Sequence, residues 1–366
     1  MSTFKALLVG DEGKTSVQTV TLPTLKEGQV LIKSVAFAAN PTDWKHLTFG
    51  LAKKDAIVGN DVSGYVEDVG PNTPGFSKGD IVSATIRGAV SKTQGAFGEY
   101  VVANAVSTLK YDKSTFKVDE KLSEGEHKSS LVNTFEAAAS LTLSLGTVGV
   151  SFAHHLQLND DKSNHGKYIL IWGGATATGV IAIQIAKKIY GLNVITTASP
   201  KNHEFLKSLG ADHVFDYSSS DVVEQIKKVG DGKISYGLDT ISTPETFQAV
   251  YDATEGSTDV KLDNLLFLKE SDIKLNPNRP SVPLGGTLLY TVDGKDHSFG
   301  PALIPSSKKL VAEFTYFWTK LVPPHLNELK SNNLLVLKPG LNSATEALDL
   351  LKNNKVSAAK VVWRLK

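Results

Sequence analysis

A glycine-rich turn is the clearest chemical motif of the 366-residue sequence. The run Gly173-Gly174-Ala175-Thr176-Ala177-Thr178-Gly179 stands between the apolar stretch Tyr168–Trp172 and an apolar helical pattern at 180–190. A first glycine permits a tight turn and a last one permits close helix–strand packing, so that free helix N–H groups face a pyrophosphate. An α/β turn without a ligand is the alternative. The predicted cofactor-binding residues of the turn are Gly174, Ala175, Thr176 (in place of the usual middle glycine), Ala177, Thr178 and Gly179.

The end of the next strand candidate, at 193–198, indicates which dinucleotide is bound. Sites that prefer NADH place an Asp or Glu about 20 residues after the glycines, against the ribose 2′-hydroxyl. The segment Ser199-Pro200-Lys201-Asn202 has no acid, and it offers a hydroxyl and a cation that suit a 2′-phosphate. The segment therefore favours NADPH over NADH, with Ser199, Lys201 and Asn202 as cofactor-binding residues. Alternatively, Lys201 is an ordinary exposed lysine and Ser199 caps a helix.

The sequence offers little for a metal. It contains no cysteine, which excludes disulfides, thiolate nucleophiles and cysteine-ligated zinc. His154 and His155 are neighbours on a predicted helix, where adjacent side chains point about 100° apart and do not converge on one ion. We predict no metal site.

The elements that must position these residues change in character near residue 133. Before it, closely spaced strand candidates predict an antiparallel, barrel-like sheet. After it, strands and helices alternate with short connections, which predicts a doubly wound α/β sheet. The predicted strands are 4–9, 17–22, 29–39, 61–69, 80–86, 168–172, 193–198, 213–215, 236–241, 261–268, 286–291, 334–338 and 360–365, and the predicted helices are 134–158 (interrupted at Gly146 and Gly149), 180–190, 202–209, 221–229, 308–321 and 343–352.

A series of motifs in fixed order resembles a known family. It includes Asn40-Pro-Thr-Asp-Trp-Lys45, Gly59-Asn-Asp-Val-Ser-Gly64, Gly95-Ala-Phe-Gly-Glu-Tyr100, the glycine-rich turn and Ser208-Leu-Gly-Ala-Asp-His-Val-Phe-Asp-Tyr217. Over nearly its whole length the chain resembles zinc-independent members of the medium-chain dehydrogenase/reductase superfamily. Similar branches are quinone-oxidoreductase-like proteins, fungal alcohol-dehydrogenase-like reductases and trans-acting enoyl reductases of fungal polyketide pathways.

The resemblance implies an α/β fold in which a Rossmann doubly wound parallel sheet is inserted into a GroES-like β-barrel catalytic domain. We predict residues 1–140 plus 300–366 as the GroES-like catalytic domain and 141–299 as the Rossmann dinucleotide-binding domain. The substrate cleft is expected between them.

The resemblance also implies site residues. Zinc-dependent relatives have a cysteine where Asn40 stands and a histidine where Asn60 stands, so a zinc-polarised carbonyl is excluded. Hydride transfer builds negative charge on oxygen, which a donor must stabilise or protonate. The predicted catalytic residues are Lys45 as that donor, Asn40 and Asp43 as pocket residues, and Thr147 beside the nicotinamide. Alternatively, Lys45 pairs with Asp43 or with the cofactor phosphates.

Further cofactor contacts follow from the same resemblance. Tyr217 matches an adenosine-side tyrosine, with a plain packing role as the alternative. Tyr290 and Thr291 match a strand beside the nicotinamide. Lys360, placed before the last strand, matches a cofactor-binding lysine, with a solvated lysine as the alternative.

Charge and function class complete the prediction. The formal net charge of +1 gives no long-range attraction for nucleic acid or an anionic membrane, so we predict neither partner. With no signal peptide and no apolar run of about 18 residues evident, a cytoplasmic monomer or homodimer is expected. We predict an NADPH-dependent, metal-independent oxidoreductase acting on small activated carbonyls or conjugated alkenes (aldehydes, enals, enones, quinones). A trans-acting enoyl reductase of a polyketide synthase and a non-catalytic NADPH-binding protein remain alternatives.

Overall fold

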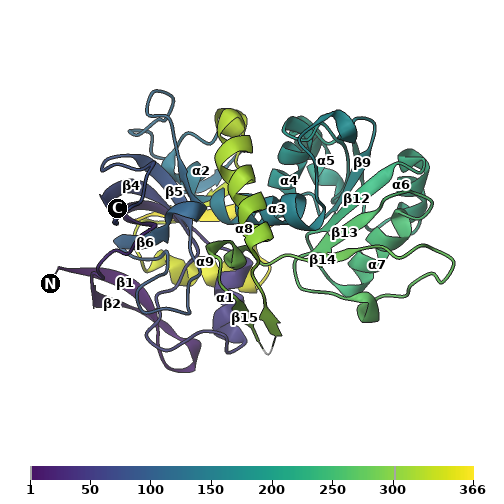
Figure 1. The fold of residues 1–366 in the computed structure, drawn as a ribbon. Coiled ribbons are helices and arrows are strands. Elements are labelled where there is room, and N and C mark those ends of the chain that lie inside the picture. Colours follow the sequence, from purple (N-terminus) through teal and green to yellow (C-terminus); the bar gives the residue numbers. More distant parts are fainter. Residues whose placement is uncertain (1, 301) are drawn as a thin grey trace. The chain divides into compact units, whose positions relative to one another are not determined.

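Strand composition separates two kinds of sheet in the chain. The strand Thr15–Thr21 (β2) alternates between exposed and half-buried residues, as expected for an antiparallel strand with one face in water. The strand Tyr168–Trp172 (β9) is buried at four of its five positions, as expected for a parallel strand covered on both faces. The computed structural model describes residues 2–300 and 302–366 of the chain (Figure 1).

The contacts divide the chain into two compact units. Unit 1 comprises Met1–Gly146, Tyr290–Ser306 and Leu326–Lys366, and unit 2 comprises Thr147–Leu289 and Ser307–His325. These limits differ from the predicted boundaries at 140 and 300. Residues 307–325, predicted for the catalytic domain, belong to unit 2, whereas 290–299, predicted for the Rossmann domain, belong to unit 1.

Unit 1 is built on a mostly antiparallel sheet with strand order β7-β5-β4-β3-β18-β17-β8, in which β6 also pairs with β3. Two hairpins, β1–β2 and β15–β16, accompany it. Its elements are β1 (Thr3–Val9), β2, β3 (Gln29–Ala38), α1 (Pro41–Thr48), β4 (Asp61–Val69), β5 (Ile81–Thr85), β6 (Tyr100–Asn104), β7 (Thr108–Lys110), β8 (Gly125–His127), α2 (Phe135–Ala139), β15 (His297–Phe299), β16 (Ala302–Ile304), β17 (Asn333–Val336), α9 (Ser343–Lys352) and β18 (Ala359–Arg364).

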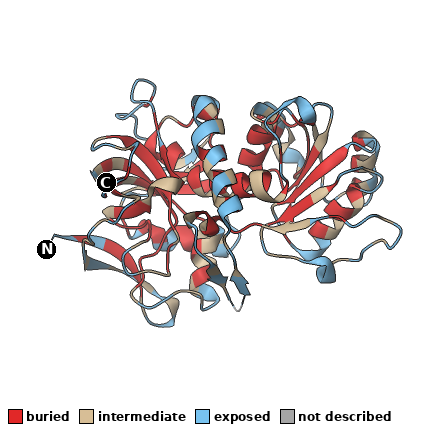
Figure 2. Cartoon of the chain, viewed as in Figure 1, coloured by how far each residue is buried: buried red, intermediate tan, exposed pale blue. Residues whose placement is uncertain are grey.

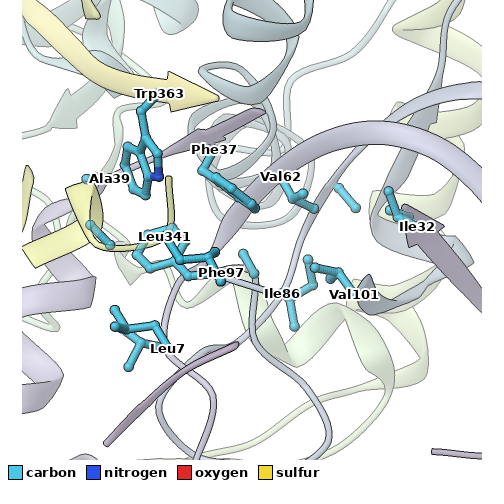
Figure 3. Packing of buried hydrophobic residues seen from close by; sticks show 14 of the residues in the cluster. Leu7, Ile32, Phe37, Ala39, Val62, Ile86, Phe97, Val101, Leu341 and Trp363 are labelled. Atoms are coloured by element: carbon cyan, nitrogen blue, oxygen red, sulfur yellow. The ribbon is translucent and has the colours of Figure 1, made fainter. Parts of the chain in front are cut away.

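An aromatic centre holds the core of unit 1 (Figure 3). Phe37, Phe97 and Trp363 are fully buried, and the Phe97 and Trp363 rings meet edge to face with centroids 4.9 Å apart. Gly59 is required here, because it has a φ of +96° and a Cβ would lie 2.3 Å from the Phe97 ring. The core therefore fixes the chain immediately before Asn60.

Unit 2 is built on a parallel sheet with strand order β11-β10-β9-β12-β13-β14, the order of dinucleotide-binding sheets. Helices α4 and α5 lie on one side of its strands and α6 and α7 on the other (Figure 1), and the strands between them are buried (Figure 2). Its elements are β9, α4 (Ala177–Lys188), β10 (Asn193–Thr197), α5 (His203–Ser208), β11 (His213–Phe215), α6 (Val222–Gly230), β12 (Ile234–Asp239), α7 (Pro244–Ala253), β13 (Lys261–Asn264), β14 (Leu284–Gly286) and α8 (Lys308–Tyr316), whereas α3 (Thr142–Val150) begins in unit 1 and ends in unit 2.

Two local predictions were wrong. The predicted strand at 286–291 is replaced by β14, which ends at Gly286, and by a 3₁₀ turn at Leu289–Asp293. Leu288, Leu289 and Val292 are all buried, and this three-to-four-residue spacing fits a helical turn rather than an alternating strand. The predicted breaks at Gly146 and Gly149 are absent, because both glycines lie within α3. At Gly149 a Cβ would lie 2.5 Å from the ring of Phe317, so the glycine makes room for that ring.

Within the described residues, one helical stretch is long and apolar enough, by length and composition, to cross a membrane. It covers Phe135–His155, 21 residues, and 89% of its most apolar window is buried by the rest of the protein. Core helices of globular proteins have the same character, so burial accounts for its composition.

Candidate functional site

The glycine-rich turn of unit 2 connects β9 to α4 as predicted. Gly173 has a φ of +83°, which a side chain rarely tolerates. A Cβ on Gly174 would lie 2.1 Å from the Thr196 hydroxyl oxygen, and a Cβ on Gly179 would lie 2.4 Å from the Gly173 carbonyl oxygen. Each glycine is therefore required by close approach of the turn to β10 or to itself.

The side chain of Thr176 caps the helix that follows. Its hydroxyl accepts a hydrogen bond from the Gly179 N–H (2.9 Å) and donates one to the Thr240 hydroxyl (2.9 Å). Among the described residues, the N–H groups of Ala177 and Thr178 in the same first turn have no acceptor. Free amides at a helix N-terminus suit an anion, so the turn fits a dinucleotide pyrophosphate.

The residues predicted to bind the 2′-phosphate lie where the strands β10 and β11 end. Ser199 Oγ and Tyr217 OH are 3.0 Å apart and share a hydrogen bond, which brings together two residues 18 positions apart. Lys201 is exposed in a short 3₁₀ turn, Pro200–Asn202. Tyr217 is 52% exposed, and its contact with the adenosine side of the cofactor stays a prediction. The acid beside it, Asp216, accepts hydrogen bonds from Ser218.

A separate buried polar cluster lies within unit 1. Asn40 precedes α1, and its N–H donates to Asp43 Oδ2 (2.7 Å), while the side-chain amide of Asn60 donates to Asp43 Oδ1. Asp43 is only 1% exposed, and this burial raises its pKa to about 7 in spite of both hydrogen bonds. The two residues at the family's zinc-ligand positions therefore meet on one carboxyl group.

Lys360 supplies the cation of this cluster. Its ammonium donates to Asn40 Oδ1 (2.5 Å) and to Asp61 Oδ2 (3.2 Å), and the Lys360 side chain is 3% exposed. Asp61 is fully buried and also accepts from the Thr142 hydroxyl (2.9 Å). Lys360 lies within β18 rather than before it, and the alternative of a solvated lysine is wrong. Its predicted contact with the cofactor stays a prediction.

Four side chains that we did not predict as catalytic extend the cluster. The Tyr290 hydroxyl donates to Asn60 Oδ1 (2.8 Å) and lies 3.5 Å from the Thr42 hydroxyl. His46 Nδ1 donates to the Thr42 carbonyl oxygen (2.8 Å). The guanidinium of Arg87 lies over the Tyr290 ring, 5.2 Å from its centroid. Tyr290 was predicted only as a cofactor contact on a strand, and no local pattern in the sequence links it to Asn60.

Lys45 stands apart from the hydrogen bonds of the cluster. It is half-buried on α1, with its ammonium 5.9 Å from the centroid of the Trp44 ring, and burial lowers its pKa. The hydrogen bonds of Asp43 come from Asn40 and Asn60, so the alternative of a Lys45–Asp43 ion pair is wrong. Thr147 is half-buried on α3, in unit 2. The structure leaves the catalytic roles of both residues as predictions.

A metal was the other option for polarising a substrate. Within residues 2–300 and 302–366, no group of three or more His, Cys, Asp or Glu side chains could hold a metal ion. His154 Nδ1 lies 2.7 Å from Glu313 Oε2, an ion-pair geometry rather than a shared metal site.

Family models match both parts of the chain. A model described as the alcohol dehydrogenase GroES-like domain matches residues 26–113, and one described as zinc-binding dehydrogenase matches 177–258. An uncharacterized protein of Saccharomyces cerevisiae is 37% identical over 100% of this chain and 98% of its own. A trans-enoyl reductase of Alternaria alternata is 33% identical over 100% of both chains.

Solved structures share the fold at lower identity. The CurK enoyl reductase matches with a TM-score of 0.71 and 19% identity, covering 99% of both chains. The quinone oxidoreductase of Coxiella burnetii matches with a TM-score of 0.66 and 20% identity over 100% of both chains. A mycobacterial protein complexed with NADPH matches with a TM-score of 0.66 and 22% identity over 99% of both chains.

These matches confirm the predicted architecture, a GroES-like domain joined to a Rossmann domain with a parallel sheet. Two relatives that match over their full length are more than 30% identical to this chain, which shows the family as well as the fold. The chain therefore belongs to the medium-chain dehydrogenase/reductase family of oxidoreductases that bind a nicotinamide dinucleotide.

Proposed function

We propose that the protein is an NADPH-dependent, metal-independent reductase that transfers hydride to small activated acceptors. Its best acceptors are alkenes conjugated to a carbonyl (enals, enones and quinones), with simple aldehydes behind them. The observation that carries the proposal is the hydrogen bonding of Asn40 and Asn60. The main-chain N–H of Asn40 and the side-chain amide of Asn60 both donate to Asp43, the side-chain amide of Asn40 donates to Asp61, and the neighbouring cation is the Lys360 ammonium.

The choice of NADPH rests on the end of β10. The Ser199–Tyr217 pair and the exposed Lys201 offer hydroxyl donors and one positive charge to a 2′-phosphate. No acid in residues 199–202 is available to accept from a 2′-hydroxyl. The NADPH complex of the mycobacterial structure with this fold supports the same choice.

Conjugate reduction suits the donors present in unit 1. Bound NADPH supplies a hydride, which is added to the β-carbon, and a proton is added to the α-carbon, so the alkene becomes saturated. The negative charge is spread over an enolate, which hydrogen-bond donors stabilise without a Lewis acid. Lys45 is the candidate donor, because burial lowers its pKa and so makes its proton easier to release.

The relatives favour one second candidate, a trans-acting enoyl reductase that works on thioesters held by a partner synthase. Proteins of that name match this chain over nearly its full length, as the Alternaria alternata protein does. Such an enzyme reduces enoyl thioesters and leaves free aldehydes untouched. Cytoplasmic location and a monomeric or homodimeric state stay predictions under both candidates.

Consumption of NADPH with a matched acceptor panel tests the proposal. The panel comprises an enone, an enal, a quinone, a saturated aldehyde and an enoyl N-acetylcysteamine thioester, each with and without EDTA. We expect turnover of the enone, enal and quinone, unchanged by EDTA. Turnover of the thioester alone would support the second candidate. Tight NADPH binding with no turnover of any acceptor would support a non-catalytic role.

A further inference from the structure

Arg87 carries a positive charge without an acidic partner. It follows β5 in unit 1 and is half-buried. Its Nη1 donates to His297 Nδ1 (2.8 Å) and its Nη2 donates to the Ser298 carbonyl oxygen (2.5 Å). Among the described residues, no carboxylate lies within ion-pair distance of the guanidinium. Arg364, in contrast, donates to both carboxylate oxygens of Glu136, at 2.6 and 3.1 Å.

The neighbours of Arg87 hold its guanidinium in one orientation. Arginine has no acceptor, so His297 must receive the hydrogen bond with an unprotonated Nδ1. Its other nitrogen, Nε2, then carries the hydrogen and donates to Asp293 Oδ1 (3.0 Å). The Tyr290 ring beneath the guanidinium adds a cation–π contact. Asp293 thus balances the charge only through an imidazole, and the guanidinium is fixed by neutral groups.

Two buried polar atoms in the same cluster lack partners. Arg87 Nε is buried and has no acceptor among the described residues, and His46 Nε2 is buried and has no donor. His46 belongs to the cluster because its ring lies 6.1 Å from that of Phe299, the residue after Ser298. Buried polar atoms are normally satisfied by protein groups, ordered water or a bound ion, and a carboxylate oxygen could serve the Arg87 Nε–H in that way, whereas His46 Nε2 needs a donor.

We propose that Arg87 binds a carboxylate of the substrate, so that the preferred acceptors are conjugated alkenes that bear a carboxylate group. The proposal rests on the proposed function, because it assigns the substrate class of that same activity. Besides its buried Nε–H, the guanidinium keeps one unused hydrogen on each Nη, and such a planar set of donors matches the two oxygens of a carboxylate.

A matched pair of acceptors tests the proposal. The pair is 3-benzoylacrylate and its methyl ester, which share the enone and differ in the negative charge. We expect the wild-type kcat/KM for the acid to exceed that for the ester about 10-fold or more. In Arg87→Met the ratio of kcat/KM for the acid to kcat/KM for the ester falls about 10- to 100-fold. Arg87→Lys keeps the charge without the planar fork, so its loss is intermediate.

Arg279→Met is the matched control. Arg279 also lies over a tyrosine ring, Tyr251 (4.4 Å), and donates to main-chain carbonyls, but it is in unit 2. The measured quantity is the ratio of kcat/KM for the acid to kcat/KM for the ester. A lower folded fraction of a variant lowers both values equally and leaves this ratio unchanged. We expect the Arg279→Met ratio to equal that of the wild type. An equal ratio in wild type and Arg87→Met overturns the proposal.

A binding measurement separates this proposal from the proposed function. Calorimetry with the saturated acid 3-benzoylpropionate needs no turnover. If the saturated acid binds Arg87→Met about 10-fold or more weakly than it binds the wild type, the carboxylate site is supported. This holds even if neither acceptor is reduced, because the absence of turnover would contradict only the proposed function. If the ester is reduced and the saturated acid binds equally to both proteins, the proposed function stands and the carboxylate site is wrong.

Discussion

The ammonium of Lys360 lies 3.2 Å from Asp61 Oδ2, and the two side chains are 3% and 0% exposed. Breaking a buried pair leaves the other charge uncompensated. We predict that Lys360→Met lowers the free energy of unfolding by about 3–5 kcal/mol, and that adding Asp61→Asn recovers most of the loss. Urea unfolding checks this, with Lys54→Met as the control, because the Lys54–Asp11 pair is exposed. A single variant as stable as the wild type would show that the pair contributes nothing.

Protonation of Asp43 makes stability depend on pH. Burial raises its pKa from 3.8 to about 7, so the folded state binds this proton more tightly than the unfolded state. The resulting stabilisation is complete below pH 3.8 and is lost as the pH rises through 7. Relative to Asp43→Asn, the wild type should therefore lose about 1.4 kcal/mol of unfolding free energy per pH unit within this window. Unfolding curves of both proteins from pH 5 to pH 8 measure the difference, and a constant difference would contradict the buried proton.

Lys201 tests the cofactor preference. Lys201→Ala should weaken NADPH binding about 10- to 100-fold and leave NADH binding nearly unchanged, because only NADPH carries the 2′-phosphate. Lys207→Ala is the control, since Lys207 pairs with Glu204 on the next helix. Fluorescence titration with each cofactor gives the four affinities. An equal loss for NADPH and NADH would overturn the assignment of the 2′-phosphate site.

Substitution of Gly174 tests whether close approach of the glycine-rich turn to β10 is needed for NADPH binding. In Gly174→Ala the new Cβ would lie 2.1 Å from the Thr196 hydroxyl oxygen, so the turn must shift and NADPH binding should fall at least about 10-fold. Thr196→Ala removes that oxygen, and the double variant should regain part of the affinity. Titration of NADPH against the single and double variants decides this. Wild-type affinity in the single variant would mean that the turn does not hold the cofactor.

Local patterns in the sequence predicted most of unit 2. The strands Tyr168–Trp172 and His213–Phe215 have the predicted bounds. The first is a continuous apolar run that ends at a glycine, a pattern typical of a strand buried on both faces. The glycine-rich turn was equally clear. The turn at Leu289–Asp293 was misread, because a short apolar run fits a strand and a helical turn alike.

The cluster in unit 1 was only partly predictable. Asn40 and Asp43 are three residues apart at a helix start, so their contact is local. Tyr290 and Asn60, by comparison, are 230 positions apart and meet only because the chain returns from unit 2 to unit 1. Lys360 was identified by resemblance, but its burial against Asp61 follows from the pairing of β18 with β3, which no local pattern encodes.

Transfer of deuterium from NADPH labelled at the reactive C4 position to an enone tests the central claim most directly. Mass spectrometry and NMR of the product locate the label and the reduced bond. We predict a saturated ketone with deuterium on the β-carbon, formed equally well in the presence of EDTA. An allylic alcohol with deuterium on the former carbonyl carbon, or activity that EDTA abolishes, would contradict metal-independent conjugate reduction.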